Sequence, residues 1–405
     1  MKILFINGLF NYGSTGRIVK SIFDFSKESG EDTYAIYGYF SDDEPNLFKT
    51  IRTKNKIPLY LEMLKTRMTG YNGFDRKRET KKAIEFIEKI KPDIINIHNL
   101  HGGYINALQL MAYINKNNYK VVLTLHDCWN MTGQCPHFIE YGCEKWKLEC
   151  CNCDFYKKIE YPKSWFFDRS REQFKNKIEM FSNNKIVVVS PCKWISLFAK
   201  ESVTLRDKRH IVIYNGIDFW KIKAEPIKLS SSKKILLGVS ASWTKSKGID
   251  DFGLLSTLIS SNYQIVLVGK AKREIRKKYS KIVFTGSKLN QKEIKYLYEN
   301  AYLFLNLTHA DTFPTTNIEA LQSGTPIISY NTGGCLELKK DGMVFITKNN
   351  SPVSVIEIIN EIGTIDFSRS QIREYGMSFS KDKMNKEYLK LFRQLFKESH
   401  QNEKI

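Results

Sequence analysis

The segment HADTFPTTNIEALQSGTPII, residues 309–328, decides how the rest of the chain is interpreted. Thr316 with Glu319 three positions later has the spacing of a capping box, and a glycine and a proline then stop the helix. The segment therefore predicts a turn after the strand YLFLNLT, a short helix over about residues 317–323, and a further strand TPIISY. The capping box explains Glu319 in structural terms, but it leaves Asp311 unexplained.

Strand-like runs alternate with amphipathic helical patterns along the whole chain, which is typical of βα units in parallel sheets. The first half holds KILFIN, DTYAIYGYF, DIINIHN, KVVLTLHD, KIVVVS and HIVIYNGID. After a polar link at about 221–232 the alternation restarts with KKILLGVSAS, YQIVLVGK, KIVFTG, YLFLNLT and TPIISY. We therefore predict an α/β protein of two doubly wound Rossmann-like domains facing a cleft. The predicted domains are residues 1–218 and 219–385, and a last helix, 386–405, packs back on the first domain.

The composition is that of an ordinary globular protein, since 42% of the 405 residues are hydrophobic and 26% are charged. The first residues, MKILFINGLF, lack a small-residue cleavage site and predict no signal peptide. No apolar run reaches the roughly 18 residues of a spanning helix, so we expect a cytoplasmic protein.

The net charge of +20 favours an anionic partner. Residues 51–82 hold ten Lys or Arg against three Asp or Glu, with apolar residues between them. Such a segment suits the inner face of an anionic membrane, to which the protein would attach peripherally. An ordinary packed helix with a solvated basic face explains the segment equally well.

In doubly wound sheets, ligands bind beyond the carboxyl ends of the strands. Three loops at such ends hold candidate residues. Gly16 and Arg17 in NYGSTGRI suit an anion at a helix start, although a plain tight turn is the alternative. Lys247 in SWTKSKGID opposes the helix dipole unless a phosphate lies there. His126, at the end of KVVLTLHD, can bind a ligand or move a proton, or it is a structural histidine.

Six of the eight cysteines lie between residues 128 and 153, directly after His126. In a chain without a secretory signal, such clustering favours metal binding over disulfides. Cys135, Cys143, Cys150 and Cys153 are the candidate ligands of a structural zinc. The alternative is a set of reduced cysteines in an irregular loop.

The order of these motifs resembles that of family 4 retaining glycosyltransferases. DTFPTTNIEALQSGTPII is similar to the family's carboxyl-terminal signature of two acidic residues eight apart. GSTGR, TLHD, IYNGID and KG resemble its glycine loop, its histidine strand, the start of its second domain and its phosphate-contacting lysine. The cysteine-rich insert, 128–153, is similar to that of a bacterial branch that makes surface polysaccharides. Ala241 and Ser242 stand where the family commonly has an arginine.

The resemblance implies a GT-B fold and transfer of a sugar from a nucleotide-sugar to a glycan or a polyprenyl-diphosphate-linked acceptor. Such a hexosyltransferase would act in capsule, exopolysaccharide or O-antigen synthesis, and the first domain would bind the acceptor. The resemblance implies catalytic roles for His126, Asp311 and Glu319. It implies donor binding by Gly16, Arg17, Lys247, Thr315, Thr316, Asn317 and Glu319.

Catalysis is expected to need no metal, because fixed cations and helix-end amides can stabilise a leaving diphosphate. In addition, no aspartate is followed by another two positions later, as in a metal-binding DxD pair. Two other functions remain open: a nucleotide-sugar epimerase of the same fold, and a zinc-containing nucleic-acid-binding protein. No recognisable nucleic-acid-binding motif supports the latter, so we expect no nucleic acid partner.

Overall fold

The computed structural model describes residues 1–39, 47–50, 57–74, 76–158, 163–227, 233–286, 289–363 and 365–402. The chain forms two compact units. Unit 1 comprises Met1–Tyr214 and Met384–Ile405, and unit 2 comprises Asn215–Lys383. The predicted domain boundary, between residues 218 and 219, lies a few residues later in the chain.

Unit 1 is built on a parallel sheet with the strand order β3-β2-β1-β4-β5-β6-β7. The order reverses between β1 and β4, which makes the sheet doubly wound. Strand β1 is buried on both faces, as expected for a parallel sheet covered by helices on both sides. The strands are β1 (Lys2–Leu9), β2 (Asp32–Tyr39), β3 (Leu47–Lys49), β4 (Ile94–Ile97), β5 (Lys120–Thr124), β6 (Ile186–Ser190) and β7 (Arg209–Val212).

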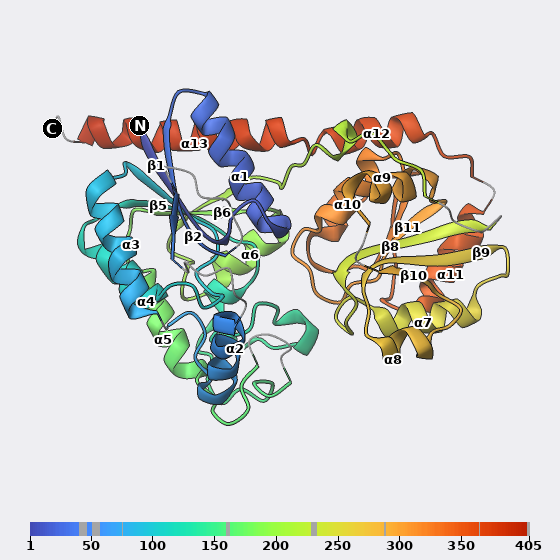
Figure 1. The fold of residues 1–405 in the computed structure, drawn as a ribbon, viewed down its shortest axis with the longest axis horizontal. Helices are drawn as coiled ribbons and strands as arrows, with labels where there is room; N and C mark the ends of the chain where they lie inside the picture. The colour runs from blue at the N-terminus through green and yellow to red at the C-terminus, as the bar shows by residue number, and fades with distance from the viewer. Residues whose placement is uncertain are drawn as a thin grey trace. The chain divides into compact units, whose positions relative to one another are not determined.

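Helices cover both faces of this sheet (Figure 1). Helices α1 and α13 share a core with one face, in which Phe5 meets Phe23 of α1 and Phe392 of α13. Helices α3, α4 and α5 lie together on the other face (Figure 1). The helices of unit 1 are α1 (Gly13–Glu28), α2 (Ile57–Thr69), α3 (Lys77–Ile90), α4 (Ala107–Lys116), α5 (Ser170–Met180), α6 (Lys193–Glu201) and α13 (Lys381–Asn402), which starts in unit 2.

Unit 2 repeats the plan with the strand order β10-β9-β8-β11-β12-β13, again all parallel. Here the order reverses between β8 and β11. The strands are β8 (Lys234–Ser242), β9 (Tyr263–Lys270), β10 (Val283–Gly286), β11 (Leu303–Asn306), β12 (Ile327–Ser329) and β13 (Val344–Ile346). The helices are α7 (Ile249–Leu258), α8 (Arg273–Lys278), α9 (Gln291–Asn300), α10 (Thr315–Gln322), α11 (Pro352–Ile362) and α12 (Arg369–Met377).

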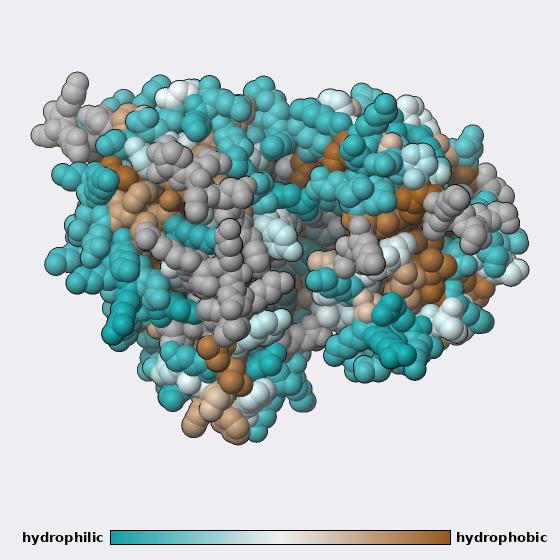
Figure 2. Space-filling model, in the orientation of Figure 1, coloured by the Kyte–Doolittle hydropathy of each residue, from teal (hydrophilic) through white to brown (hydrophobic). Residues whose placement is uncertain are grey.

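The predicted fold class, an α/β protein with two doubly wound Rossmann-like sheets, is confirmed. The last helix, α13, packs on unit 1: Tyr388 bonds Thr124 at 3.2 Å, and Asn385 donates to Ser21 at 2.9 Å. Among the described residues, no helix is long and apolar enough to cross a membrane. Apolar side chains gather at the end of unit 1 where α2 lies (Figure 2).

Candidate functional site

The loops that follow β8 and β11 meet at the carboxyl edge of the unit 2 sheet, where the strand order reverses. His309 N–H donates to the Ser246 carbonyl at 2.8 Å, and the Thr308 hydroxyl donates to the same carbonyl at 3.1 Å. Gly248 makes this approach possible, since its φ is +73° and an added Cβ would lie 2.1 Å from the Leu307 carbonyl oxygen. The two strand ends that flank the ligand position of a doubly wound sheet are thus tied together.

This junction brings Lys247 to Asp311. The Lys247 ammonium lies 2.8 Å from the Asp311 carboxylate and also donates to the Ala310 carbonyl at 3.2 Å. Thr312 N–H donates to the other carboxylate oxygen of Asp311 at 2.9 Å. Both charged side chains are part-exposed, at 34% and 26%, so the pair presents a cation and an anion to a ligand. An exposed pair of this kind contributes only up to about 1 kcal/mol to stability.

Glu319 lies on α10, one loop further along the chain, and the predicted capping box is wrong. The N-cap of α10 is Pro314 and makes no side-chain cap hydrogen bond, so the helix begins at Thr315 rather than at about residue 317. The Glu319 carboxylate is buried and accepts a hydrogen bond from the Tyr298 hydroxyl at 3.0 Å. A tertiary contact from α9 therefore holds Glu319.

The first turn of α10 contains Thr315, Thr316 and Asn317, three of the residues predicted to bind the donor. The N–H groups of a first helical turn point out along the helix axis, with the positive end of the helix dipole. The Asn317 side chain is fully buried and accepts from Asn306 of β11 at 2.7 Å. Asn317 thus joins α10 to the sheet, and its backbone N–H donates to the Pro314 carbonyl at 3.2 Å.

A histidine and an aspartate that the sequence analysis did not select lie at the same edge. His309 Nε2 is 2.6 Å from Asp251 in the first turn of α7, and both side chains are part-exposed. The sequence does carry a signal for this pair. Asp250 and Asp251 open a helix next to a lysine, and His309 begins the loop after the neighbouring strand.

In unit 1, predicted site residue His126 lies just beyond the end of β5 and is paired with His98, just beyond β4. Their rings stack with centroids 5.1 Å apart, and His98 Nδ1 is 2.8 Å from His126 Nε2. Beside them, His101 is 2.8 Å from Asp127. Burial alone would raise the pKa of Asp127, but the neighbouring His101 outweighs this effect and the pKa is lowered to about 2. Asp127 is therefore ionised at neutral pH.

Hydrogen bonds fix which ring nitrogens carry protons. The Asn96 amide nitrogen donates to the Val122 carbonyl at 2.9 Å, so the Asn96 amide oxygen faces His98 Nε2 at 2.8 Å and must accept a hydrogen bond from it. His98 therefore carries its proton on Nε2. Burial lowers the pKa of His98 well below its usual value, so the ring is neutral and its Nδ1 accepts from His126 Nε2. Burial likewise lowers the pKa of His126 to about 4. Neutral His126 then keeps a lone pair on Nδ1, which can accept a hydrogen bond from a hydroxyl group.

Acidification is expected to lower the free energy of unfolding between about pH 6.5 and pH 4. Within that window the unfolded chain protonates His126 and the folded chain does not, so stability is lost as the pH falls through it. One such histidine contributes up to about 1.4 kcal/mol per pH unit. Urea unfolding across this range should show a shallower pH slope for His126→Asn than for the unchanged protein. Equal slopes would contradict the assignment of a neutral, buried His126.

Predicted site residues Gly16 and Arg17 are the fourth and fifth residues of α1, near the carboxyl end of β1. Gly16 accepts from Asn11 N–H at 3.1 Å, and an added Cβ would lie 3.2 Å from the Leu9 backbone, so α1 sits close against the end of β1. Arg17 is exposed, and its Nε donates to the Gly13 carbonyl at 3.2 Å. The structure thus places a cation beside the strand that flanks the reversal point of the unit 1 sheet.

The cysteine insert is an irregular loop with three single-turn 3-10 helices, η1 (Trp129–Met131), η2 (Ile139–Tyr141) and η3 (Lys145–Lys147). None of its six cysteines forms a disulfide in the structure. Cys135 lies within electrostatic range of Cys143, Cys150 and Cys153. However, in the ranges that the structure describes, no three His, Cys, Asp or Glu side chains are arranged to hold a metal ion. The four predicted ligands are therefore neighbours without forming a closed site.

A buried lysine lies next to these cysteines. Lys177 of α5 is fully buried and donates to the carbonyls of Trp129, Thr132 and Gly133 at 2.7, 2.7 and 3.0 Å. Burial lowers the pKa of Lys177 to about 7, against the opposing effect of Cys150 and Cys135. The lysine fixes the first turn of the insert to the body of unit 1.

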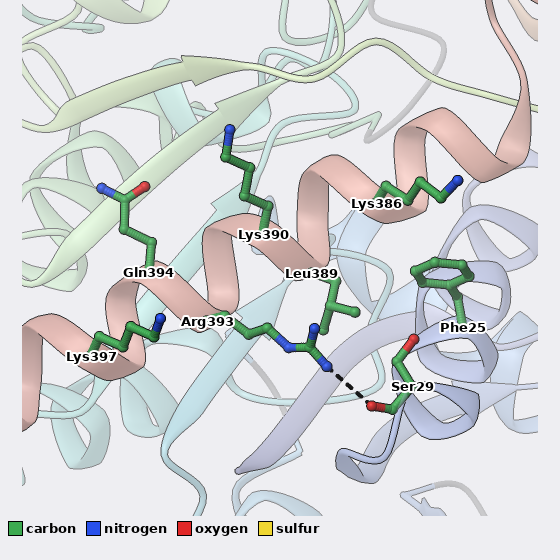
Figure 3. A pocket seen from close by; sticks show the side chains of 8 residues that line it. All are labelled: Phe25, Ser29, Lys386, Leu389, Lys390, Arg393, Gln394 and Lys397. Atoms are coloured by element: carbon green, nitrogen blue, oxygen red, sulfur yellow. Dashed lines mark hydrogen bonds between the residues drawn. The ribbon is translucent and has the colours of Figure 1, made fainter.

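A separate hollow lies between α1 and α13 in unit 1 (Figure 3). Arg393 crosses it and donates to the Ser29 carbonyl at 3.0 Å (Figure 3). None of the predicted site residues lines it; the lining residues are Phe25, Ser29, Lys386, Leu389, Lys390, Arg393, Gln394 and Lys397. The hollow is not a candidate active site, because no Asp or Glu is among its lining residues and it lies away from the carboxyl ends of the strands.

The chain is similar to known glycosyltransferases in sequence and in fold. Residues 221–379 match the family described as glycosyl transferases group 1. Over 424 residues the chain is 22% identical to the Escherichia coli (strain K12) protein named "Putative colanic acid biosynthesis glycosyl transferase WcaC", covering 98% of this chain and all of that protein. The residues that match this family all lie in unit 2.

Solved structures share the fold over nearly the whole chain. Sucrose-phosphate synthase from Thermosynechococcus elongatus matches with a TM-score of 0.70 at 13% identity, over 98% of this chain and 99% of that one. Anabaena HepE in complex with UDP and glucose matches with a TM-score of 0.63 at 15% identity, over 97% of this chain and 100% of that one. The fold is therefore GT-B.

Proposed function

We propose that this protein is a retaining glycosyltransferase that moves a sugar from a nucleotide-sugar to a glycan or a polyprenyl-diphosphate-linked acceptor. The observation that carries the proposal is the junction at the reversal point of the unit 2 sheet. There Lys247 and Asp311 meet within a group 1 domain, and Glu319 follows on α10. A similar fold holds UDP-glucose in Anabaena HepE, whose chain is covered completely at 14% identity.

Each group in the junction suits one part of such a donor. The Glu319 carboxylate, held by Tyr298, would accept hydrogen bonds from the ribose hydroxyls. Asp311 would contact the sugar, while the Lys247 ammonium and the amides of Thr315 and Thr316 would face the diphosphate. His126 would accept from a hydroxyl of the transferred sugar through Nδ1, and Arg17 and Gly16 would add to anion binding from unit 1.

These residues account for the chemistry of transfer. The bond between the anomeric carbon and the diphosphate oxygen breaks, and the acceptor oxygen bonds to the same face of that carbon. The acceptor's proton leaves with the nucleoside diphosphate, and no other reactant is needed. The negative charge that grows on the leaving group is stabilised by the Lys247 ammonium and the positive end of α10, so we propose metal-independent catalysis.

The test is a transfer assay with a panel of nucleotide-sugars and lipid-linked acceptors, read out by nuclear magnetic resonance of the product. The proposal predicts transfer from one donor with the anomeric configuration kept, in the presence of a chelator. An inverted product would contradict the retaining mechanism. Loss of activity with the chelator, restored by added divalent metal, would contradict metal independence. We further propose that the pathway is surface-polysaccharide synthesis at the inner face of a membrane, as the similarity to WcaC suggests.

We also propose that zinc draws together Cys135, Cys143, Cys150 and Cys153 as a structural site. Burial raises the pKa of the Cys150 thiol to about 12 and also raises the pKa of Cys153, although backbone N–H groups of Gly133 and Phe155 bond their sulfurs and act in the opposite direction. Zinc would therefore displace the thiol protons as it binds. Four thiolates on Zn²⁺ carry two net negative charges, which the buried ammonium of Lys177 would partly balance. Zinc would thereby order an insert that has little regular secondary structure.

Elemental analysis of the purified protein is expected to find about one zinc per chain. Cys143→Ser or Cys153→Ser should remove the metal and lower the melting temperature, because each takes away one of four ligands. Cys151→Ser is the matched control and should retain it, since Cys151 lies between two ligands without being one. Metal-free protein with freely titratable thiols would contradict the site.

A further inference from the structure

Helix α2 in unit 1 leaves an apolar stripe uncovered. Tyr60, Leu61, Leu64 and Met68 are exposed by 65%, 60%, 43% and 49%. Residues 60, 64 and 68 recur every four positions, and so they lie on one face of the helix. The stripe thus faces away from the core of the unit that carries it.

Three consecutive aromatic residues lie next to the end of this helix, although they are distant in sequence. Trp165, Phe166 and Phe167 are exposed by 39%, 62% and 51%. Trp165 N–H donates to the Arg67 carbonyl at 2.7 Å, and the Arg67 guanidinium lies 5.8 Å from the centre of the Trp165 ring. Gly70 has φ +79°, and a Cβ added to it would lie 2.8 Å from the Phe167 carbonyl oxygen. The lack of a side chain at Gly70 therefore allows the two segments to approach closely.

Together these two segments form one exposed surface, which we call the apolar patch. It consists of Tyr60, Leu61, Leu64, Met68, Trp165, Phe166 and Phe167. Figure 2 shows apolar side chains gathered at the end of unit 1 where Figure 1 places α2. Contiguous exposed apolar surface of this kind marks an interaction site.

Basic residues surround the apolar patch. Some of them belong to α2, and the others lie before and after the three aromatic residues in the chain. A hydrogen bond from Ser164 N–H to the Tyr156 carbonyl, at 3.2 Å, connects the segment that precedes the aromatic residues to them. Of the nearby acids, Asp168 accepts from the N–H groups of Cys153 and Ser170, and Glu172 forms an ion pair with Arg169 at 3.4 Å. The exposed or part-exposed basic residues are Lys65, Arg67, Lys157, Lys158, Lys163 and Arg169.

We propose that the apolar patch docks unit 1 on an anionic lipid bilayer. Aromatic side chains at the level of the headgroups, ringed by Lys and Arg, are the features that hold a protein in a membrane interface. Lysine and arginine can reach the lipid phosphates while their stems remain on apolar surface. The bilayer would be the membrane partner in the proposed function, on which this role rests. Binding of the apolar patch to lipid does not itself require sugar transfer.

The charge around the patch argues against pairing with a second copy of the chain. A two-fold interface places a surface against itself, so this basic rim would face an identical basic rim. Like charges brought together in this way repel, whereas a bilayer with anionic headgroups attracts all of them at once.

Co-sedimentation with phosphatidylcholine vesicles, with and without phosphatidylglycerol, tests the proposal on the full chain. We expect binding to the anionic vesicles to be at least about tenfold tighter and to weaken with salt. The double variant Phe166→Ser, Phe167→Ser should bind at least about tenfold more weakly. The matched control is Leu254→Ser, Leu258→Ser in unit 2, which removes comparably exposed apolar side chains and should bind normally.

Two results would overturn the docking proposal, and a third would bear only on the proposed function. Equal binding to both kinds of vesicle, or to the double variant and the unchanged protein, shows that the patch is not an anionic-lipid site. Absence of vesicle binding, with a dimer in sedimentation velocity that the double variant abolishes, assigns the patch to self-association. Vesicle binding by a protein with no transfer activity leaves the docking surface in place and refutes only the proposed function.

Discussion

Replacing Glu319 by glutamine, or Lys247 by alanine, is expected to lower the rate of sugar transfer at least about tenfold with the fold intact. A charge-assisted hydrogen bond is worth roughly 1.5 to 3 kcal/mol, and each 1.4 kcal/mol corresponds to about a factor of ten in rate. Glutamine keeps the shape of Glu319 and can still accept from Tyr298, while its charge is lost. The measurement is the initial rate at saturating donor, together with the melting temperature of each variant.

Stability should change little in the Lys247 variant, because its partner Asp311 remains part-exposed to water. The matched controls are Glu361→Gln and Lys339→Ala, exposed residues of the same unit that should leave the rate unchanged. Lys245→Ala tests whether the neighbouring exposed lysine shares the role of Lys247. Near-normal rates in both Glu319→Gln and Lys247→Ala would refute the assignment of this junction as the donor site.

Replacing Gly248 by alanine is expected to lower the free energy of unfolding of unit 2 by at least about 2 kcal/mol. Positive φ alone costs a non-glycine residue of order 1 to 3 kcal/mol, and the added Cβ would also meet the Leu307 carbonyl at 2.1 Å. Because Gly248 lets the Lys247 loop rest on the end of β11, the transfer rate should fall as well. Denaturant unfolding and the transfer assay measure the two effects.

Gly342→Ala is the control that separates backbone strain from steric clash. Gly342 has φ +70°, close to the +73° of Gly248, but an added Cβ there meets no atom within 4 Å. Gly342→Ala should therefore lower the free energy of unfolding by less than Gly248→Ala does, and it should leave the transfer rate unchanged. If the two variants were equally stable and equally active, the close approach of the two loops would have no role in building the site.

The sequence predicts the sheets well because parallel strands buried on both faces leave long apolar runs. It fails where a contact joins distant residues. The spacing of Thr316 and Glu319 suggested a capping box, but Pro314 takes the N-cap and Tyr298, from the preceding helix, takes the Glu319 carboxylate. Spacing within one segment carries no information about such a partner.

The same limit applies to the residues that the sequence analysis missed. The pairing of His98 with His126 depends on the register of β4 and β5, and that of His309 with Asp251 depends on two loops meeting. The basic segment was recognised as membrane-like, but only about half of the apolar patch lies in it. The aromatic residues 165–167 join it through a hydrogen bond to Arg67, far away in sequence.

The central claim is that the loops after β8 and β11 form a site for a nucleoside diphosphate. Titration calorimetry with UDP, GDP, ADP and CDP, in the presence of a chelator, tests it most directly. One nucleotide should bind the unchanged protein, and Glu319→Gln should weaken that binding by about tenfold or more. If none of the four binds, or if the bound one binds Glu319→Gln and Lys247→Ala as tightly as the unchanged protein, the claim is contradicted.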